Sequence, residues 1–263
     1  MARKGIGTVL KAVTFDLWNT LIELHDPDQP HQLRVERVRA VLARFGCQAG
    51  WEEVSRQIKI SWQKLLQLQY SHGLDFTPAQ QVAAIVRHFG LHQNPEAEAE
   101  LYRAYAETLL QLPPRVVDGA DEMLTEVSSR FALGLICNTG STPGYVLRDF
   151  LERVGLARHF RTMTFSDELG VAKPNPLIFN HTLQLLAAEA GEALHIGDDP
   201  LTDIRGALAA GIRAIWVCPA DEQPFPVHTR SLELPPLQLL VPPETARVRR
   251  LGEIPQLLEA VAG

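Results

Sequence analysis

The second half of this sequence alternates between segments with helical spacing and short apolar runs, and this alternation limits the fold more than any other feature. After Asp118, apolar runs occur at residues 131–137, 162–165, 194–197 and 213–218, with helix-like segments between them. Strands that are separated by helices pair in parallel, and both faces of such a sheet are covered. The pattern therefore predicts an α/β fold with a doubly wound parallel sheet.

The start of the chain offers one more strand. Residues 12–15 favour a strand, and a carboxylate, Asp16, follows them directly. Open α/β sheets bind their ligands beyond the carboxyl ends of the strands. This position makes Asp16 a candidate for chemistry, although an aspartate also commonly caps the loop after a strand.

A helical segment separates these two parts. About ninety residues, a common size for a small domain, carry four helical patterns with no strand between them. Pro78 and Pro95 open the third and fourth helices, as prolines often do. Because four successive helices cannot all alternate with parallel strands, we predict a helical cap domain of residues 24–114 inserted into a core domain of residues 1–23 and 115–263.

The end of the chain is less regular. Residues 219–243 are rich in proline and predict an extended surface segment, to which we assign no role. Residues 246–250 favour a last edge strand, and residues 254–261 favour a closing helix.

Composition excludes several classes of protein. The 263 residues, of which 46% are hydrophobic, can bury a sizeable core, and the net charge of −6 argues against a nucleic-acid partner. Three widely spaced cysteines argue against a disulfide framework or a zinc site and fit a reducing cytoplasm. No signal peptide and no membrane-spanning run are visible. We therefore expect a cytoplasmic protein without a membrane partner, and its oligomeric state stays open.

Two further patches place charged residues beside predicted elements. Lys173 lies in Glu-Leu-Gly-Val-Ala-Lys-Pro-Asn-Pro, residues 168–176, and Asp198, Asp199 and Asp203 follow one of the predicted strands. Together with the stretch around the first strand, and in this order, these patches resemble the haloacid dehalogenase (HAD) superfamily, whose members mostly transfer phosphoryl groups through an aspartate. The resemblance covers nearly the whole chain and implies a Rossmann-like core with a helical cap after the first motif.

The resemblance also implies roles for these residues. Asp16 would be the nucleophile and would form an aspartyl-phosphate, which divides one difficult step into two. Mg²⁺, which prefers oxygen ligands, would be held by the carboxylates of Asp16 and Asp198 and by the backbone carbonyl of Trp18. Lys173 would neutralise like charges around the nucleophile.

Two more aspartates follow the same strand. Asp203 would lie behind the metal ligands, and Asp199 would be either a ligand or a cap for the following helix. Acidic residues are also favoured at a helix start by the helix dipole alone. Their position directly after a buried strand, with Lys173 upstream, favours the metal site.

The second motif departs from the family. HAD proteins usually have Ser or Thr at the end of the second strand, often followed by Asn, and here the residues are Cys137 and Asn138. Because a thiol is a weak hydrogen-bond donor, we expect the phosphate to contact Asn138, Thr139 and backbone N–H groups as well as Cys137.

The first motif departs from it too. Most HAD phosphatases have a second aspartate two residues after the nucleophile, which acts as acid and base, and here this residue is Trp18. General acid–base catalysis is worth about 10² to 10⁴ in rate, and acyl and aryl phosphates need it least. The sequence therefore predicts a Mg²⁺-dependent phosphohydrolase of a small phosphorylated metabolite that lacks the usual acid.

Two alternatives stay open. HAD-type 2-haloacid dehalogenases also replace the second aspartate with an aromatic residue, but they dispense with Mg²⁺ and lack the acidic pair formed here by Asp198 and Asp203. A weakly active or non-catalytic binding protein of the same fold is the other alternative, and the substitutions at Trp18 and Cys137 motivate it.

Overall fold

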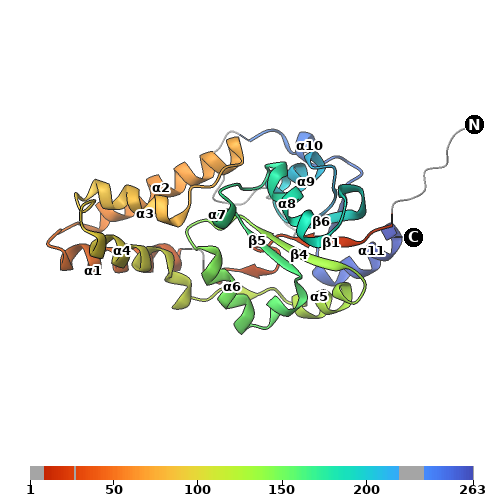
Figure 1. The fold of residues 1–263 in the computed structure, drawn as a ribbon, viewed down its shortest axis with the longest axis horizontal. Coiled ribbons are helices and arrows are strands. Elements are labelled where there is room, and N and C mark those ends of the chain that lie inside the picture. Colours follow the sequence, from red (N-terminus) through yellow and green to blue (C-terminus); the bar gives the residue numbers. More distant parts are fainter. Residues whose placement is uncertain (1–8, 27, 219–233, 263) are drawn as a thin grey trace, which may run out of the picture.

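The structure, a computed structural model, describes residues 9–26, 28–218 and 234–262. Four helices lie at one end of the molecule, and an α/β core lies at the other (Figure 1). Within the described ranges, no helix is long and apolar enough to cross a membrane.

The core contains a six-stranded sheet in which every neighbouring pair of strands is parallel. The strands are β1 (Ala12–Phe15), β4 (Ala132–Cys137), β5 (Thr162–Phe165), β6 (Ala193–Gly197), β7 (Arg213–Val217) and β8 (Ala246–Val248), and their order is β5-β4-β1-β6-β7-β8. The predicted doubly wound α/β fold is therefore confirmed, with the strand expected near residue 246 at one edge.

Helices cover both faces of this sheet. One face packs against α5 (Ala120–Ser128), α6 (Gly144–Arg153) and α11 (Ile254–Ala262), and the other against α8 (Pro176–Leu186) and α9 (Gly206–Ala209). Alternate residues of a strand point to opposite faces. In β1, Val13 and Phe15 accordingly join the first core, and Ala12 joins the second.

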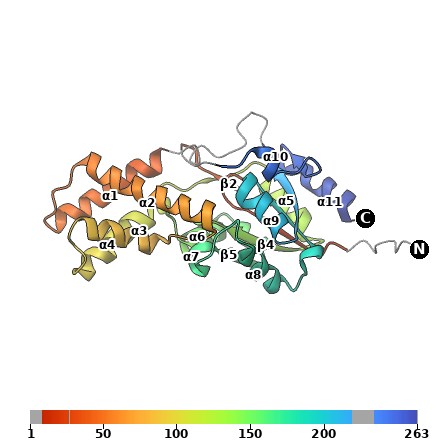
Figure 2. The ribbon, with the colours of Figure 1, turned by 90° about the horizontal axis from the view of Figure 1, so that it is seen from above.

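The four expected cap helices are present and have a core of their own. They are α1 (Gln29–Arg44), α2 (Trp51–His72), α3 (Pro78–His88) and α4 (Pro95–Ala106). In Figure 2, α1 packs on α2 and α4, and α3 packs on the same two helices. Val35, Ile58, Ile85, Leu101 and Tyr105 are among the side chains buried between them.

A short antiparallel ladder joins the two parts, and the sequence did not indicate it. Its strands, β2 (Ile22–Glu23) and β3 (Arg115–Val116), lie on the two chain segments that connect the cap to the core. Arg115 and Glu23 form an ion pair across the ladder at 2.8 Å. The predicted domain boundaries, at residues 24 and 114, flank this ladder.

The proline-rich stretch is partly different from the expectation. Residues 237–240 form a short helix, α10 (Leu237–Leu240), and Leu240 and Val241 are buried against Trp216 of β7. An extended surface segment is therefore wrong for these residues, because their apolar side chains cover the edge of the core. Residues 219–233 of the predicted segment lie outside the described residues.

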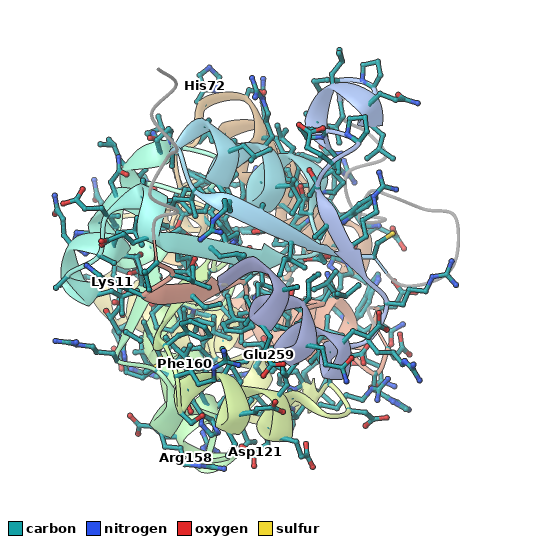
Figure 3. The ribbon with its side chains drawn as sticks, turned by 90° about the vertical axis from the view of Figure 1, so that its right-hand side faces the viewer. Lys11, His72, Asp121, Arg158, Phe160 and Glu259 are labelled. Atoms are coloured by element: carbon teal, nitrogen blue, oxygen red, sulfur yellow. The ribbon has the colours of Figure 1, made fainter. Side chains whose placement is uncertain are left out.

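Charged side chains surround the core, as its end opposite the cap shows (Figure 3). Asp121 and Arg158 form an ion pair at 2.6 Å, and Glu259 of α11 pairs with Arg130 at 2.9 Å. Solvent screens exposed pairs of this kind, so each of them contributes little to stability. A fully buried Leu or Phe side chain contributes about 1.5–3 kcal/mol, so apolar burial holds the core together.

The cap and the core meet along a second segment, between α2 and α3. The backbone N–H of Ala172 donates to Gly73 O at 3.0 Å, and Leu74 forms an antiparallel bridge with Val171. Gly73 has a φ of 60°, and a Cβ atom on it would lie 2.5 Å from Cβ of Asn175. Glycine thus allows the cap to lie directly against the segment that carries Lys173.

This close approach predicts the effect of two alanine substitutions. Gly90 also has a positive φ, but a Cβ atom on it would have no neighbour within 4 Å. Gly90→Ala should therefore cost only the left-handed backbone strain, about 1–2 kcal/mol, whereas Gly73→Ala should cost more because two backbone segments must separate. Urea unfolding of both variants measures the difference, and equal losses would contradict the close packing at Gly73.

Candidate active site

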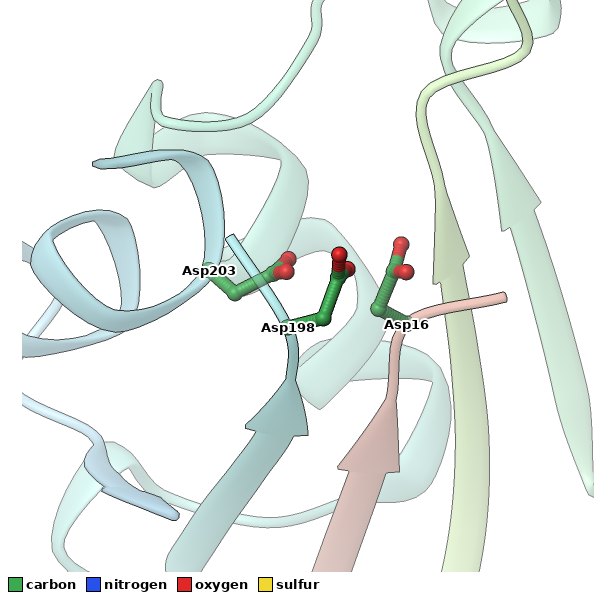
Figure 4. A group of neighbouring side chains, drawn as sticks. All are labelled: Asp16, Asp198 and Asp203. Carbon is green, nitrogen blue, oxygen red and sulfur yellow. The ribbon is translucent and has the colours of Figure 1, made fainter. Parts of the chain in front are cut away.

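Three aspartates meet beyond the carboxyl ends of two neighbouring strands (Figure 4). Asp16 directly follows β1, Asp198 directly follows β6, and Asp203 lies in the helical turn Pro200–Arg205. The backbone N–H of Asp16 donates to Ile196 O at 2.8 Å, which fixes the nucleophile candidate to β6. One carboxylate oxygen from each aspartate lies within 4.8 Å of the others, so the group could hold a metal ion.

Lys173 is the buried cation of this cluster. Its side chain is 1% exposed, and its Nζ donates to Asp203 Oδ1 at 2.6 Å and to Asp16 Oδ1. Burial alone would lower the pKa of Lys173, but the carboxylates of Asp16 and Asp203 hold it above its ordinary value. Lys173 is therefore charged across the physiological pH range.

The carboxylates respond to burial in different ways. Burial, partly offset by the ammonium group of Lys173, raises the pKa of Asp16 to about 7. For Asp203, the attraction of Lys173 and the hydrogen bond from His195 outweigh burial and hold the pKa well below its usual range. Burial and the charge of Asp16 raise the pKa of Asp198, which has no hydrogen bond or ion pair to its carboxylate within the described part of the chain.

Further contacts fix Asp203. His195 of β6 is fully buried, and its Nε2 lies 3.2 Å from Asp203 Oδ1 while its Nδ1 lies 2.9 Å from Thr14 Oγ1. The backbone N–H of Asp199 donates to Asp203 Oδ2 at 2.9 Å. A Cβ atom at Gly197 would lie 2.3 Å from Asp203 Cγ, so only glycine fits there. Sequence reasoning missed His195, although an imidazole inside a buried strand is itself a signal.

Asp199 acts as a helix cap. Its Oδ1 accepts hydrogen bonds from the backbone N–H groups of Leu201 and Thr202, both at 2.8 Å. Its Oδ2 accepts a hydrogen bond of 2.5 Å from the hydroxyl of Tyr70, a residue of cap helix α2. Of the two roles predicted for Asp199, the structure supports the helix cap, and it adds a contact between the cap domain and the site that the sequence did not indicate.

The loop after β1 contains Trp18. The loop is tightly turned, because Asn19 has a φ of 55° and its N–H donates to Ile22 O at 2.7 Å. Trp18 is partly buried against the core, two residues after Asp16. No carboxylate occupies this position.

The loop after β4 is hydrogen-bonded to the backbone of Lys173. The side-chain amide of Asn138 donates to Lys173 O at 2.9 Å and accepts from Lys173 N at 2.8 Å. Thr139 donates its N–H to Ser166 Oγ at 2.9 Å. Cys137 is fully buried, and burial raises the pKa of its thiol, which keeps it neutral. Of the residues predicted to bind phosphate, Asn138 contacts the backbone of Lys173, whereas Thr139 contacts Ser166 and Asp75.

Comparison with known proteins is consistent with this geometry. A family model for haloacid dehalogenase-like hydrolases matches residues 10–211. The chain is 36% identical to the phosphoserine phosphatase of Thermus thermophilus over 47% of this chain and 48% of that protein. It is 28% identical to the N-acylneuraminate-9-phosphatase of Mus musculus over 87% of this chain and 93% of that protein.

Solved structures share the fold. A 2-haloacid dehalogenase from Pseudomonas syringae pv. Tomato has a TM-score of 0.66 at 22% identity, covering 95% of this chain and 99% of that one. The HAD-hydrolase YfnB from Bacillus subtilis, bound to magnesium, has a TM-score of 0.60 at 20% identity, covering 95% and 99%. At these identities, the likeness concerns the fold alone.

The buried ammonium group predicts a stability effect. Lys173→Met would leave Asp16 and Asp203 buried without a cation, and removal of one partner of a buried ion pair typically costs about 3–5 kcal/mol. The control is Lys11→Met, because Lys11 is exposed and pairs with Glu192 only at the surface. Urea unfolding of the metal-free proteins should show the large loss for Lys173→Met only, and an unchanged or higher stability would contradict this role of Lys173.

Proposed function

Because this chain belongs to the haloacid dehalogenase-like hydrolase family, we propose that it is a Mg²⁺-dependent phosphohydrolase that forms an aspartyl-phosphate on Asp16. The observation that carries the proposal is the cluster of Asp16, Asp198 and Asp203, in which Lys173 pairs with Asp16 and Asp203. Relatives that are named phosphatases support a phosphorylated metabolite as the substrate class.

The donor set fits Mg²⁺. Three carboxylates lie together, two of them are paired with the ammonium group of Lys173, and Mg²⁺ prefers such oxygen ligands. Asp203 is already held by Lys173, His195 and a backbone N–H. Asp16 and Asp198, together with the carbonyl of Trp18, are therefore the groups that would hold the ion. When bound, Mg²⁺ would supply positive charge that offsets the charge of the phosphoryl oxygens.

Asp16 performs the covalent step. One oxygen of its carboxylate attacks phosphorus, the bond between phosphorus and the leaving oxygen breaks, and the electron pair of that bond departs with the leaving group. Water then attacks phosphorus, the bond between phosphorus and the Asp16 oxygen breaks with its electron pair returning to the carboxylate, and both protons of the water leave with the inorganic phosphate. The neighbouring ammonium of Lys173 favours the ionised form of Asp16 that this attack requires.

The cap limits access of water to these groups. Tyr70 of α2 reaches Asp199, and Gly73 lies directly against the segment that carries Lys173. A closed cap would exclude water during the attack and would select the substrate by its shape.

Trp18 sets the preferred leaving group. An indole neither donates the proton that an alkoxide needs nor activates water, so this chain lacks a contribution of about 10² to 10⁴ in rate. Carboxylate and phenolate leaving groups depart without a proton. The proposed enzyme therefore acts fastest on acyl or aryl phosphates.

Dehalogenation is the second candidate, and Trp18 is the specific observation that favours it, because displacement of halide needs no acid. A halide site without a metal would not need the unpartnered carboxylate of Asp198 beside Asp16. A Mg²⁺-dependent phosphohydrolase would use the carboxylate of Asp198 as a metal ligand, whereas a dehalogenase would have no use for it.

The test is hydrolysis of acetyl phosphate, p-nitrophenyl phosphate and glycerol phosphate with and without Mg²⁺, with chloride release from 2-chloropropionate measured in parallel. We expect Mg²⁺-dependent phosphate release, slowest by about 10² or more for the alkyl ester, because only that leaving group needs the missing acid. Asp16→Asn should abolish this release, and Asp149→Asn on exposed α6 is the control.

Metal-independent chloride release would replace the proposal with the dehalogenase. No turnover in either assay, together with Mg²⁺ binding detected by calorimetry, would support the non-catalytic binding protein. Calorimetry of Asp198→Asn shows whether that binding depends on the aspartate cluster.

A further inference from the structure

A buried carboxylate of the cap inserts into the core beside the loop after β4. Asp75 lies between α2 and α3 and is only 8% exposed. Its Oδ2 accepts hydrogen bonds from two core hydroxyls, Ser166 Oγ at 3.1 Å and Thr139 Oγ1 at 3.4 Å. Asp75 is thus a cap residue whose side chain ends among core residues.

The cap holds the other oxygen of this carboxylate. Asp75 Oδ1 accepts from the backbone N–H of Phe76 at 2.9 Å and from Nε2 of Gln69 at 3.1 Å. The ion pairs of the described residues include none with Asp75, so neutral donors alone hold it. Burial raises the pKa of Asp75 in spite of these donors. A buried charge of this kind is costly, which points to a role beyond simple packing.

The core partners of Asp75 connect it to the proposed catalytic groups. Ser166 Oγ accepts the backbone N–H of Thr139 at 2.9 Å, so Asp75, Ser166 and Thr139 form one network. The residue before Thr139 is Asn138, whose amide makes two hydrogen bonds to the backbone of Lys173. The network therefore leads from the cap to the lysine that contacts Asp16.

The backbone around Asp75 docks on the same segment. The N–H of Asp75 donates to Gly170 O at 3.3 Å. Two residues earlier in the cap, Gly73 O accepts from the N–H of Ala172. Any separation of the cap from the core would break the contacts of the Asp75 side chain with Thr139 and Ser166 together with these backbone contacts. The docked position of the cap and the contacts of the loop after β4 thus share the same hydrogen bonds.

We propose that Asp75 is a positioning residue: with the cap docked, its carboxylate orients Ser166 and Thr139 and so fixes the loop that holds Lys173 through Asn138. The effect of Asp75 on catalysis rests on the proposed function, whereas its role in holding the cap against the core does not. It also changes the expectation for Thr139, because the hydroxyl of Thr139 serves Asp75 and not a phosphate when the cap is docked.

Asparagine and alanine at position 75 separate positioning from acid–base chemistry. Hydroxyl groups both donate and accept, so Ser166 and Thr139 can rotate to bind an amide in place of the carboxylate. Asp75→Asn should therefore keep the network, whereas Asp75→Ala removes it. If Asp75 instead replaced the acid that is missing at Trp18, both variants would lose activity equally.

The first measurement is hydrogen exchange by mass spectrometry on the metal-free proteins, which needs no activity. In Asp75→Ala, peptides that cover residues 138–142 and 166–172 should exchange about tenfold faster, as loss of one or two hydrogen bonds implies. Asp75→Asn and the exposed control Asp149→Ala should match the wild type. Unchanged protection of both peptides in Asp75→Ala would overturn the proposal, whether or not the protein is a phosphatase.

The second measurement is the kinetics of acetyl phosphate hydrolysis. Asp75→Ala should lower kcat by about tenfold or more with a smaller effect on KM, because a misplaced lysine weakens transition-state stabilisation more than binding. Asp75→Asn should stay within about threefold of the wild type, well under the change for a catalytic acid. An equal loss in both variants would show that the charge itself is needed and would overturn positioning in favour of acid–base catalysis.

Discussion

The ammonium group of Lys173 between Asp16 and Asp203 is the interaction on which the rest of the site depends. Carboxylates gathered in a buried site repel one another, and a cation between them makes their burial tolerable. Lys173 can take this position only because its segment is held from both sides. Asn138 holds it from the core, and Gly73 of the cap lies against it.

The single positive charge of Lys173 does not balance the three carboxylates of the site, and this excess of negative charge underlies the proposed chemistry. Asp203 is satisfied by Lys173 and His195, but Asp198 has no such partner among the described residues, and burial raises its pKa. A divalent cation and a phosphoryl group are a natural complement to this arrangement. In the proposed mechanism, the absence of a carboxylate at Trp18 removes proton transfer to the leaving group and from water, and it leaves the nucleophile and its electrostatic surroundings intact.

The sequence predicted what depends on local pattern and missed contacts between segments that are far apart in the chain, such as that of His195 with Thr14 in the core and those made by the docked cap. Asp16, Lys173 and Asp198 each lie beside a strand or helix with a clear apolar period, and the parallel sheet brings them together. Tyr70 lies on the predicted helix α2 and Asp75 lies in the connection after it, and their partners Asp199 and Ser166 are 129 and 91 residues away. No local signal reports contacts of this kind. Residues 237–241 show a similar limit, because the prolines on either side of them predicted an exposed segment, whereas Leu240 and Val241 pack against Trp216, which lies more than 20 residues earlier in the chain.

The proposed function requires covalent phosphorylation of Asp16. The most direct measurement is mass spectrometry of the protein after acid quenching during turnover of acetyl phosphate, because low pH preserves an acyl phosphate for peptide analysis. We expect the mass increment of one phosphoryl group on the peptide that contains Asp16, and no increment on the same peptide of Asp16→Asn. Turnover of acetyl phosphate with that peptide unmodified, or with the increment on another residue, would contradict it.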